Sequence, residues 1–160
     1  MSFDLYLHHF AVGESEPINP APVLKVLALE RYQGPNQFGF YVIEFPDGVG
    51  VKFNASGLDG TEPFSGCAFH IRGISPQLIQ FVYDVAVAGD FVIFNCQGAN
   101  TAESPVLILV APEQEQQLDE ALTAQYSIRP VCSSAEMLGN LLFVGYQGWQ
   151  AYRDHIVGDA

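Results

Sequence analysis

The sequence predicts an α+β fold in which residues 1–160 form a single domain, a mixed β-sheet with helices packed on it. Three stretches support this prediction: an alternating segment at the start, a β-hairpin pattern over residues 38–54, and a strand–helix–strand pattern over residues 66–96. Because 49% of the residues are apolar and only 15% are charged, a chain of this length can bury a substantial core.

The N-terminal segment 2–10 alternates as an N-terminal strand should, with Phe3, Leu5 and Leu7 on one face. The polar, proline-rich stretch 13–22 predicts a loop, and apolar residues at helical spacing predict a helix over 22–32 that Gly34-Pro35 ends. The turn sequence Pro46-Asp47-Gly48 separates two strand-like runs and predicts the hairpin.

The central unit has the clearest signals. Ser75 is a good helix N-cap and Pro76 suits the first helical position, so we expect a helix over 76–88. Gly89 is expected to end that helix in the left-handed conformation. The strand at 66–71 precedes the helix, and four consecutive apolar residues at 91–94 predict a strand covered on both faces. If the two strands pair in parallel, the crossover should be right-handed.

The last third predicts further elements. Residues 105–110 resemble a second fully apolar strand, and residues 113–126 a helix with acids facing solvent. Residues 128–132 predict a short strand. A short helix is expected from Ser133 or Ser134 through residue 142, and a last helix over 149–157, with Gly145 and Gly148 interrupting between them.

The charge balance limits the partners. Eighteen acidic against six basic residues give a net charge of -12, which disfavours contact with nucleic-acid phosphates and with anionic membranes. It suits either a basic partner protein or simple solubility.

Cysteine usage and the chain start predict the compartment. Three widely spaced cysteines without a CxxC motif favour reduced, mostly buried thiols. The start carries Asp4 and no basic segment, which predicts no signal peptide, and no apolar run is long enough for a membrane span. We therefore expect a cytoplasmic protein.

Motifs of common catalytic classes are absent: there is no GxSxG, P-loop, GxGxxG or HExxH. The sequence therefore predicts no catalytic residue, no metal ligand and no cofactor. His8 and His9 should point to opposite faces of a strand, as should Cys67 and His70. A pocket at the sheet end near Cys67, His70 and Cys96 is one hypothesis; buried structural thiols are the alternative.

Aromatic residues and an arginine gather near the C-terminus: Tyr146, Trp149, Tyr152 and Arg153. These residue types are favoured anchors of protein interfaces. The alternative is a C-terminal helix that packs on the sheet.

The segments 1–7 (MSFDLYL) and 148–154 (GWQAYRD) resemble those of a family of small, uncharacterised bacterial proteins with a similar start, centre and end. Some proteins of this size, acidity and α+β make-up act as immunity proteins in bacterial toxin systems. The resemblance implies such a role and implies no catalytic residue.

Three functions remain open from the sequence. The first is a non-catalytic domain that neutralises a basic protein, such as a toxin nuclease. The second is a small enzyme or ligand-binding domain with its pocket near Cys67, His70 and Cys96. The third is a homodimeric structural module that uses the C-terminal aromatic residues.

Overall fold

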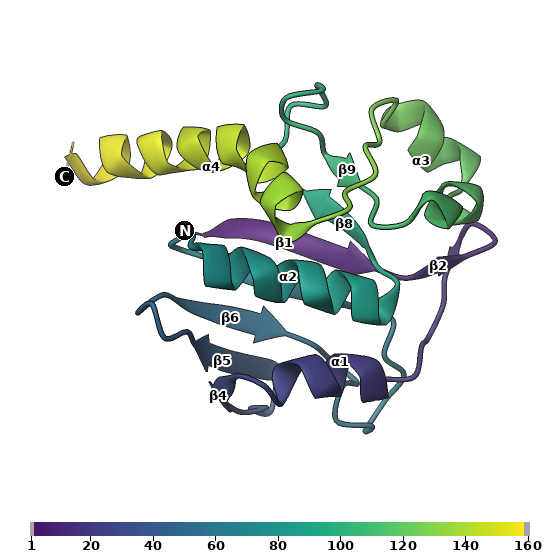
Figure 1. The fold of residues 1–160 in the computed structure, drawn as a ribbon, viewed down its shortest axis with the longest axis horizontal. Coiled ribbons are helices and arrows are strands. Elements are labelled where there is room, and N and C mark those ends of the chain that lie inside the picture. Colours follow the sequence, from purple (N-terminus) through teal and green to yellow (C-terminus); the bar gives the residue numbers. More distant parts are fainter. Residues whose placement is uncertain (1, 159–160) are drawn as a thin grey trace.

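The structure is a computed structural model that describes residues 2–158, apart from the side chains of Tyr152 and of residues 155–158. One seven-stranded sheet forms its centre, in the order β4-β5-β6-β7-β1-β8-β9 (Figure 1). The strands are β1 (Phe3–His8), β4 (Arg31–Gln33), β5 (Phe40–Glu44), β6 (Gly50–Asn54), β7 (Gly66–Ile71), β8 (Val92–Asn95) and β9 (Leu107–Ile108).

Three helices lie on one face of this sheet: α1 (Ala21–Leu27), α2 (Pro76–Gly89) and α4 (Ala135–Gly158) (Figure 1). The small hairpin β2 (Phe10–Ala11) and β3 (Glu14–Ser15), the 3₁₀ helix η1 (Pro112–Gln117) and α3 (Glu120–Gln125) lie together at one end of the molecule. None of the described helices is long and apolar enough to cross a membrane.

The predicted α+β class is confirmed, and so are the N-terminal strand, the hairpin β5–β6 and the elements β7, α2 and β8. The expectation of a mixed sheet is wrong, because every ladder between the described strands is antiparallel. β7 and β8 run in the same direction but do not pair, since β1 lies between them and is antiparallel to both. The first strand of the chain thus separates the two strands that were considered as a parallel pair.

Local interactions determine where α2 begins and ends. The Ser75 hydroxyl accepts a hydrogen bond from the Leu78 amide at 3.2 Å, as predicted. At the other end, Asp90 rather than Gly89 takes the left-handed conformation, with φ of 52°. Gly89 is needed for space instead, because a Cβ there would clash with the buried Phe91 ring.

Two predicted helices are shorter than expected. The helix predicted over 22–32 ends at Leu27, and residues 31–33 form the edge strand β4 against β5, where Tyr32 packs on Tyr41 at 5.9 Å between ring centroids. The helix predicted over 113–126 divides into η1 and α3, because the Asp119 carboxylate accepts a bond from the Leu122 amide at 2.7 Å and starts a new helix.

The other differences lie in the predicted loop 13–22 and in the C-terminal third. Residues 14–15 form β3. Only residues 107–108 of the predicted strand 105–110 are in a strand, and the predicted strand 128–132 reduces to one parallel bridge between Leu109 and Val131. The two predicted C-terminal helices are one continuous helix, α4, which passes through Gly145 and Gly148. The packing of α4 on the core, through Leu142 and Trp149, overrides the low helix propensity of the two glycines.

The two faces of the sheet differ. Under the helices lies a large core in which Phe53 stacks on Phe69 at 4.8 Å and Phe81 of α2 meets both rings edge-on. On the opposite face, a smaller core covers only β8 and β9; it consists of Val92, Leu107 and Leu109 with Phe10, Phe94, Leu118 and Tyr126. The run 91–94 is therefore largely buried from both sides, as predicted.

The rest of that opposite face has no helix on it. Along β5 and β6, exposed and buried residues alternate, and Val42 keeps 45% of its surface exposed. Tyr6 of β1 keeps 37%. This alternation is typical of an antiparallel sheet with one solvated side. We call the outer side of β5, β6, β7 and β1 the open face.

Candidate functional site

Side chains on the open face form a row across the strands. Val42 lies opposite Lys52, Lys52 opposite His70, and His70 opposite Asp4. Directly opposed residues of antiparallel strands point to the same side of the sheet. The pairing therefore places an aliphatic, a cationic, an imidazole and a carboxylate group side by side, from four strands that are distant in sequence.

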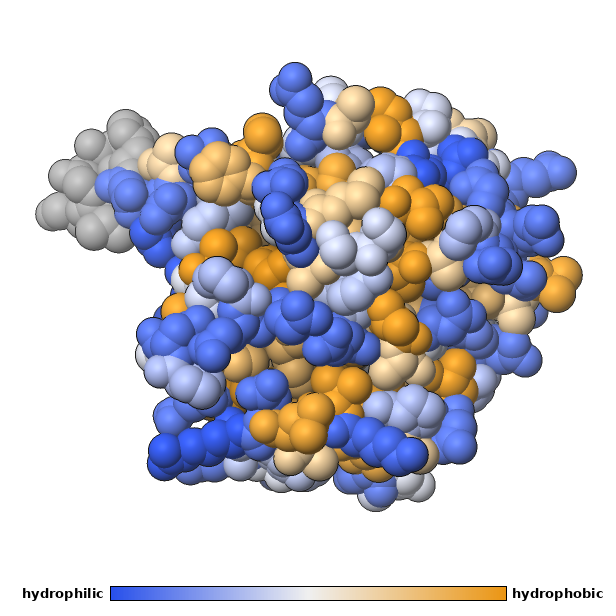
Figure 2. Space-filling view, in the orientation of Figure 1, coloured by the Kyte–Doolittle hydropathy of each residue, from blue (hydrophilic) through white to orange (hydrophobic). Residues whose placement is uncertain are grey.

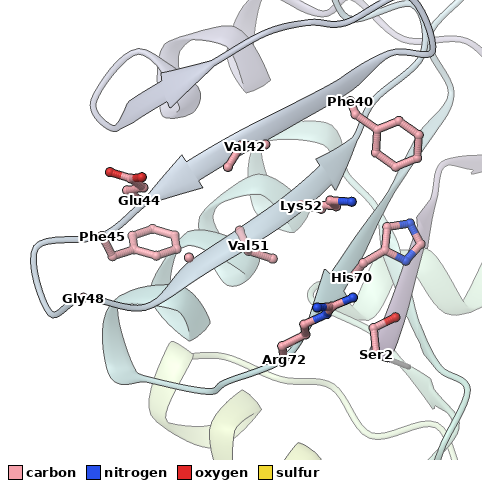
Figure 3. Close-up of a pocket in the computed structure, with 11 residues that line it drawn as sticks. Ser2, Phe40, Val42, Glu44, Phe45, Gly48, Val51, Lys52, His70 and Arg72 are labelled. Atoms are coloured by element: carbon pink, nitrogen blue, oxygen red, sulfur yellow. The ribbon is translucent and has the colours of Figure 1, made fainter.

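A groove of about 830 Å³ lies over this part of the open face (Figure 3). Gly48 and Gly50 line it without side chains, which leaves room between the turn after β5 and the end of β7. The remaining lining residues are Ser2, Phe40, Val42, Glu44, Phe45, Val51, Lys52, His70 and Arg72. We call this hollow the sheet groove.

The imidazole of His70 is held in place within the groove wall. Its Nδ1 lies 2.9 Å from Oδ1 of Asp4, and the Ser2 hydroxyl donates to the same oxygen at 2.6 Å. The Phe40 ring lies 5.9 Å from the imidazole, between centroids. Because Ser2 and His70 both contact Asp4 and not each other, this is no serine–histidine–aspartate triad.

The three residues of the sequence-based pocket hypothesis do not come together. Cys67 points to the helix-covered side with 7% of its surface exposed, and burial raises the pKa of its thiol strongly. Cys96 follows β8 and is exposed; partial burial and the nearby Asp4 carboxylate raise its pKa. Raised pKa values keep both thiols protonated at neutral pH, which makes them poor nucleophiles.

His70 alone of these three lines the sheet groove. Cys96 lies one position past the Leu5–Asn95 pair, on the far side of Asp4 from His70. Two strand spacings of about 5 Å separate the two residues, which is too far for a nucleophile–base contact. The described residues therefore present no assembled cysteine–histidine pair at this place.

Four groove residues were not predicted from the sequence: Phe40, Val42, Lys52 and Arg72. The alternation within 38–54 could have put Val42 and Lys52 on the solvated side of the hairpin. Nothing local to the sequence indicates that the hairpin pairs with β7 and so brings Lys52 beside His70.

Acidic side chains gather at the end of the molecule formed by β2, β3, η1 and α3. A second hollow, of about 370 Å³, is lined there by Glu16, Asp90 and Glu113 together with His9. Glu14 follows Gly13, which lies against Asp119, and Glu120 comes next in the chain. We call the six acids the acidic end; Figure 2 shows hydrophilic side chains over this region, on the right.

Several contacts hold the acidic end in shape. The His9 Nδ1–H donates to the Glu16 carbonyl oxygen at 2.9 Å, and its Nε2 lies 3.7 Å from Asp90. Buried Gln114 donates to Asp90 at 3.0 Å and accepts from the Val110 amide at 2.8 Å. These contacts join four segments of the chain into one surface.

The C-terminal aromatic residues pack against the sheet. Trp149 is only 6% exposed; its ring lies 6.4 Å from that of Phe3 and 5.6 Å from that of Tyr146. Arg153 covers the Trp149 ring at 4.9 Å and donates to the Arg72 carbonyl at 3.3 Å. The side chain of Tyr152 is outside the described part. The described members of this group attach α4 to the sheet.

Within the described residues, no three His, Cys, Asp or Glu side chains are grouped so that they could hold a metal ion. Comparison of the chain with protein-family models, with curated proteins and with solved structures found no match.

Proposed function

We propose that this chain is a non-catalytic protein-binding domain of the immunity-protein type, which docks a basic partner protein through its acidic end. The observation that supports the proposal is the gathering of six acids from segments distant in sequence: Glu14, Glu16, Asp90, Glu113, Asp119 and Glu120. Three of them line one hollow, and no lysine or arginine is among its described lining residues.

The basic residue next to the acidic end does not offset its negative charge. Arg129 lies close to the acidic end, and its guanidinium forms an ion pair with Glu115. The guanidinium also donates hydrogen bonds to the carbonyl oxygens of Thr123 and Tyr126. Its charge is thereby offset. A concentrated negative field raises the association rate with a basic partner and loses strength as salt screens it.

Rigidity also supports binding. Asp119 caps α3, and Asp90 is fixed by Gln114 and His9. A surface whose charged groups are already ordered loses less conformational entropy on association. The acidic end therefore has the properties of a preformed docking surface for a protein rich in lysine and arginine.

The test compares two triple variants of equal charge. Glu16→Gln, Glu113→Gln and Glu120→Gln neutralise the acidic end, whereas Glu62→Gln, Glu103→Gln and Glu136→Gln remove three exposed acids elsewhere. A partner is captured from cells of the source organism on the unmodified chain, at an ionic strength of about 0.05 M. After mass spectrometry it is purified, and its Kd is measured by calorimetry.

We expect the partner to be basic, and the acidic-end triple to weaken binding at least tenfold while the control triple changes Kd less than threefold. Binding should weaken further at an ionic strength of about 0.3 M. A neutral or acidic partner would contradict the proposal. Equal losses in the two triples would also contradict it, because only total charge would then matter.

A further inference from the structure

The sheet groove is richer in basic side chains than the chain as a whole. Acids outnumber bases three to one in the sequence, yet two of the six bases, Lys52 and Arg72, line the groove together with His70. The acids nearby are Glu44 of the lining and Asp4, which contacts His70. Figure 3 shows Lys52, His70 and Arg72 grouped near β7, with Glu44 at the other end of the hollow. A uniformly acidic, solubility-driven surface does not explain why two of the six bases gather here.

The two cations are available to a ligand. Among the described residues, neither the Lys52 ammonium nor the Arg72 guanidinium forms an ion pair, and both residues are exposed. His70 beside them is oriented by Asp4, which contacts Nδ1. The other ring nitrogen, Nε2, is left free to meet a ligand.

Two apolar side chains stand beside the cations. Phe40 and Val42 of β5 stand next to Lys52 on the open face. The side chains of Phe45 and Val51, by contrast, are buried in the core under the helices. The volume of about 830 Å³ falls within the range of small-molecule sites. Such sites combine an apolar lining with a few polar groups that fix the orientation of the ligand.

We propose that the sheet groove binds a small organic acid. Its carboxylate lies among Lys52, His70 and Arg72, and its apolar body lies against Phe40 and Val42. The groove is on the sheet face of β5, β6 and β7, whereas the acidic end is formed by β2, β3, η1 and α3, so this site is separate from the proposed protein-binding surface.

The test is a titration followed by ¹H–¹⁵N NMR of the full chain. The probe is 4-phenylbutyrate, with 4-phenylbutanol and 4-phenylbutylamine as neutral and cationic controls of the same shape. We expect saturable shifts at the amides of Val42, Lys52 and His70 with the acid. The alcohol should bind at least tenfold more weakly, and the amine should produce no saturable shift.

The variants Lys52→Gln and Arg72→Gln should each raise the Kd for 4-phenylbutyrate at least fivefold. The matched control Lys25→Gln removes an exposed base on α1, on the other side of the sheet, and should leave the Kd within twofold. All three positions are exposed, and the NMR spectrum of each free variant verifies its fold.

Three results would overturn the inference. One is equal affinity for the acid and the alcohol; another is an unchanged Kd in Lys52→Gln and Arg72→Gln. The third is binding of an acidic peptide, acetyl-Glu-Phe-Glu-amide, without binding of 4-phenylbutyrate, which would make the groove a protein-docking surface. None of these results depends on whether the acidic end binds a basic protein.

Discussion

His8 lies where the covered part of the outer sheet face meets the open face. Its ring is 5.6 Å from Phe94 and 6.1 Å from Phe10, between centroids, and it is opposite Val92 in the sheet. Burial among these apolar groups lowers the pKa of its imidazole below the ordinary value of 6.5. The folded protein therefore keeps His8 neutral at a pH where the unfolded chain takes up a proton.

This difference predicts a pH effect with a definite sign. Because the unfolded state binds more protons, the stability contributed by neutral His8 is present above about pH 6.5 and is lost as the pH falls below it. Thermal unfolding at about pH 7.5 and about pH 5.5 should show a larger drop in Tm for the unmodified chain than for His8→Phe, which keeps an aromatic ring. An equal drop in both proteins would show that His8 does not contribute.

The helix α4 approaches the end of β8 closely at one residue. Gly145 faces the segment after β8, where a Cβ would lie 3.2 Å from both the Gln97 carbonyl oxygen and Nδ2 of Asn95. At Gly148, about one turn further along the same helix, a Cβ would have no such neighbour within 4 Å. Two glycines of one helix thus have different environments: one is packed against backbone and the other faces open space.

Leucine at the two positions should act in opposite directions. Gly145→Leu forces α4 away from residues 95–97 and should lower the free energy of unfolding by about 1–3 kcal/mol, as overpacking does. Gly148→Leu, with only helix propensity changed, should raise it by about 0.5–1 kcal/mol. Urea unfolding measures both values; a similar effect at both positions would mean that α4 does not pack closely at Gly145.

At the scale of the whole molecule, the charge is unevenly distributed. The chain carries a net charge of -12, but two of its six bases, Lys52 and Arg72, lie together in the sheet groove. Like charges at the acidic end repel one another in the folded state and can separate in the unfolded chain. This repulsion lowers the free energy of unfolding.

Salt should relieve this repulsion. Raising the ionic strength from about 0.02 M to about 0.2 M shortens the Debye length from roughly 20 Å to roughly 7 Å, so Tm should rise. The rise should be smaller for Glu16→Gln, Glu113→Gln, Glu120→Gln than for Glu62→Gln, Glu103→Gln, Glu136→Gln. Differential scanning calorimetry gives both values, and identical salt dependence in the two triples would argue against a concentrated field.

Local patterns predicted most elements but misplaced several boundaries. The Ser75-Pro76 cap and the apolar run 91–94 were sufficient for α2 and β8, because capping and periodicity act between residues close in the chain. Gly145 and Gly148 were expected to separate two helices, but α4 is continuous, and Leu142 and Trp149 on either side of them are packed in the core. Residues 31–33 likewise form a strand because β5 offers them an edge.

The amino-acid sequence by itself determined the α+β class, the main central elements and the acidic character of the chain, since these follow from composition and short-range spacing. Only the tertiary structure decided that β1 enters between β7 and β8, that His70 lies between Lys52 and Asp4 on the open face, and that Cys67 points away from them. The reason is physical: strand pairing joins residues far apart in the chain, and its register selects which side chains become neighbours.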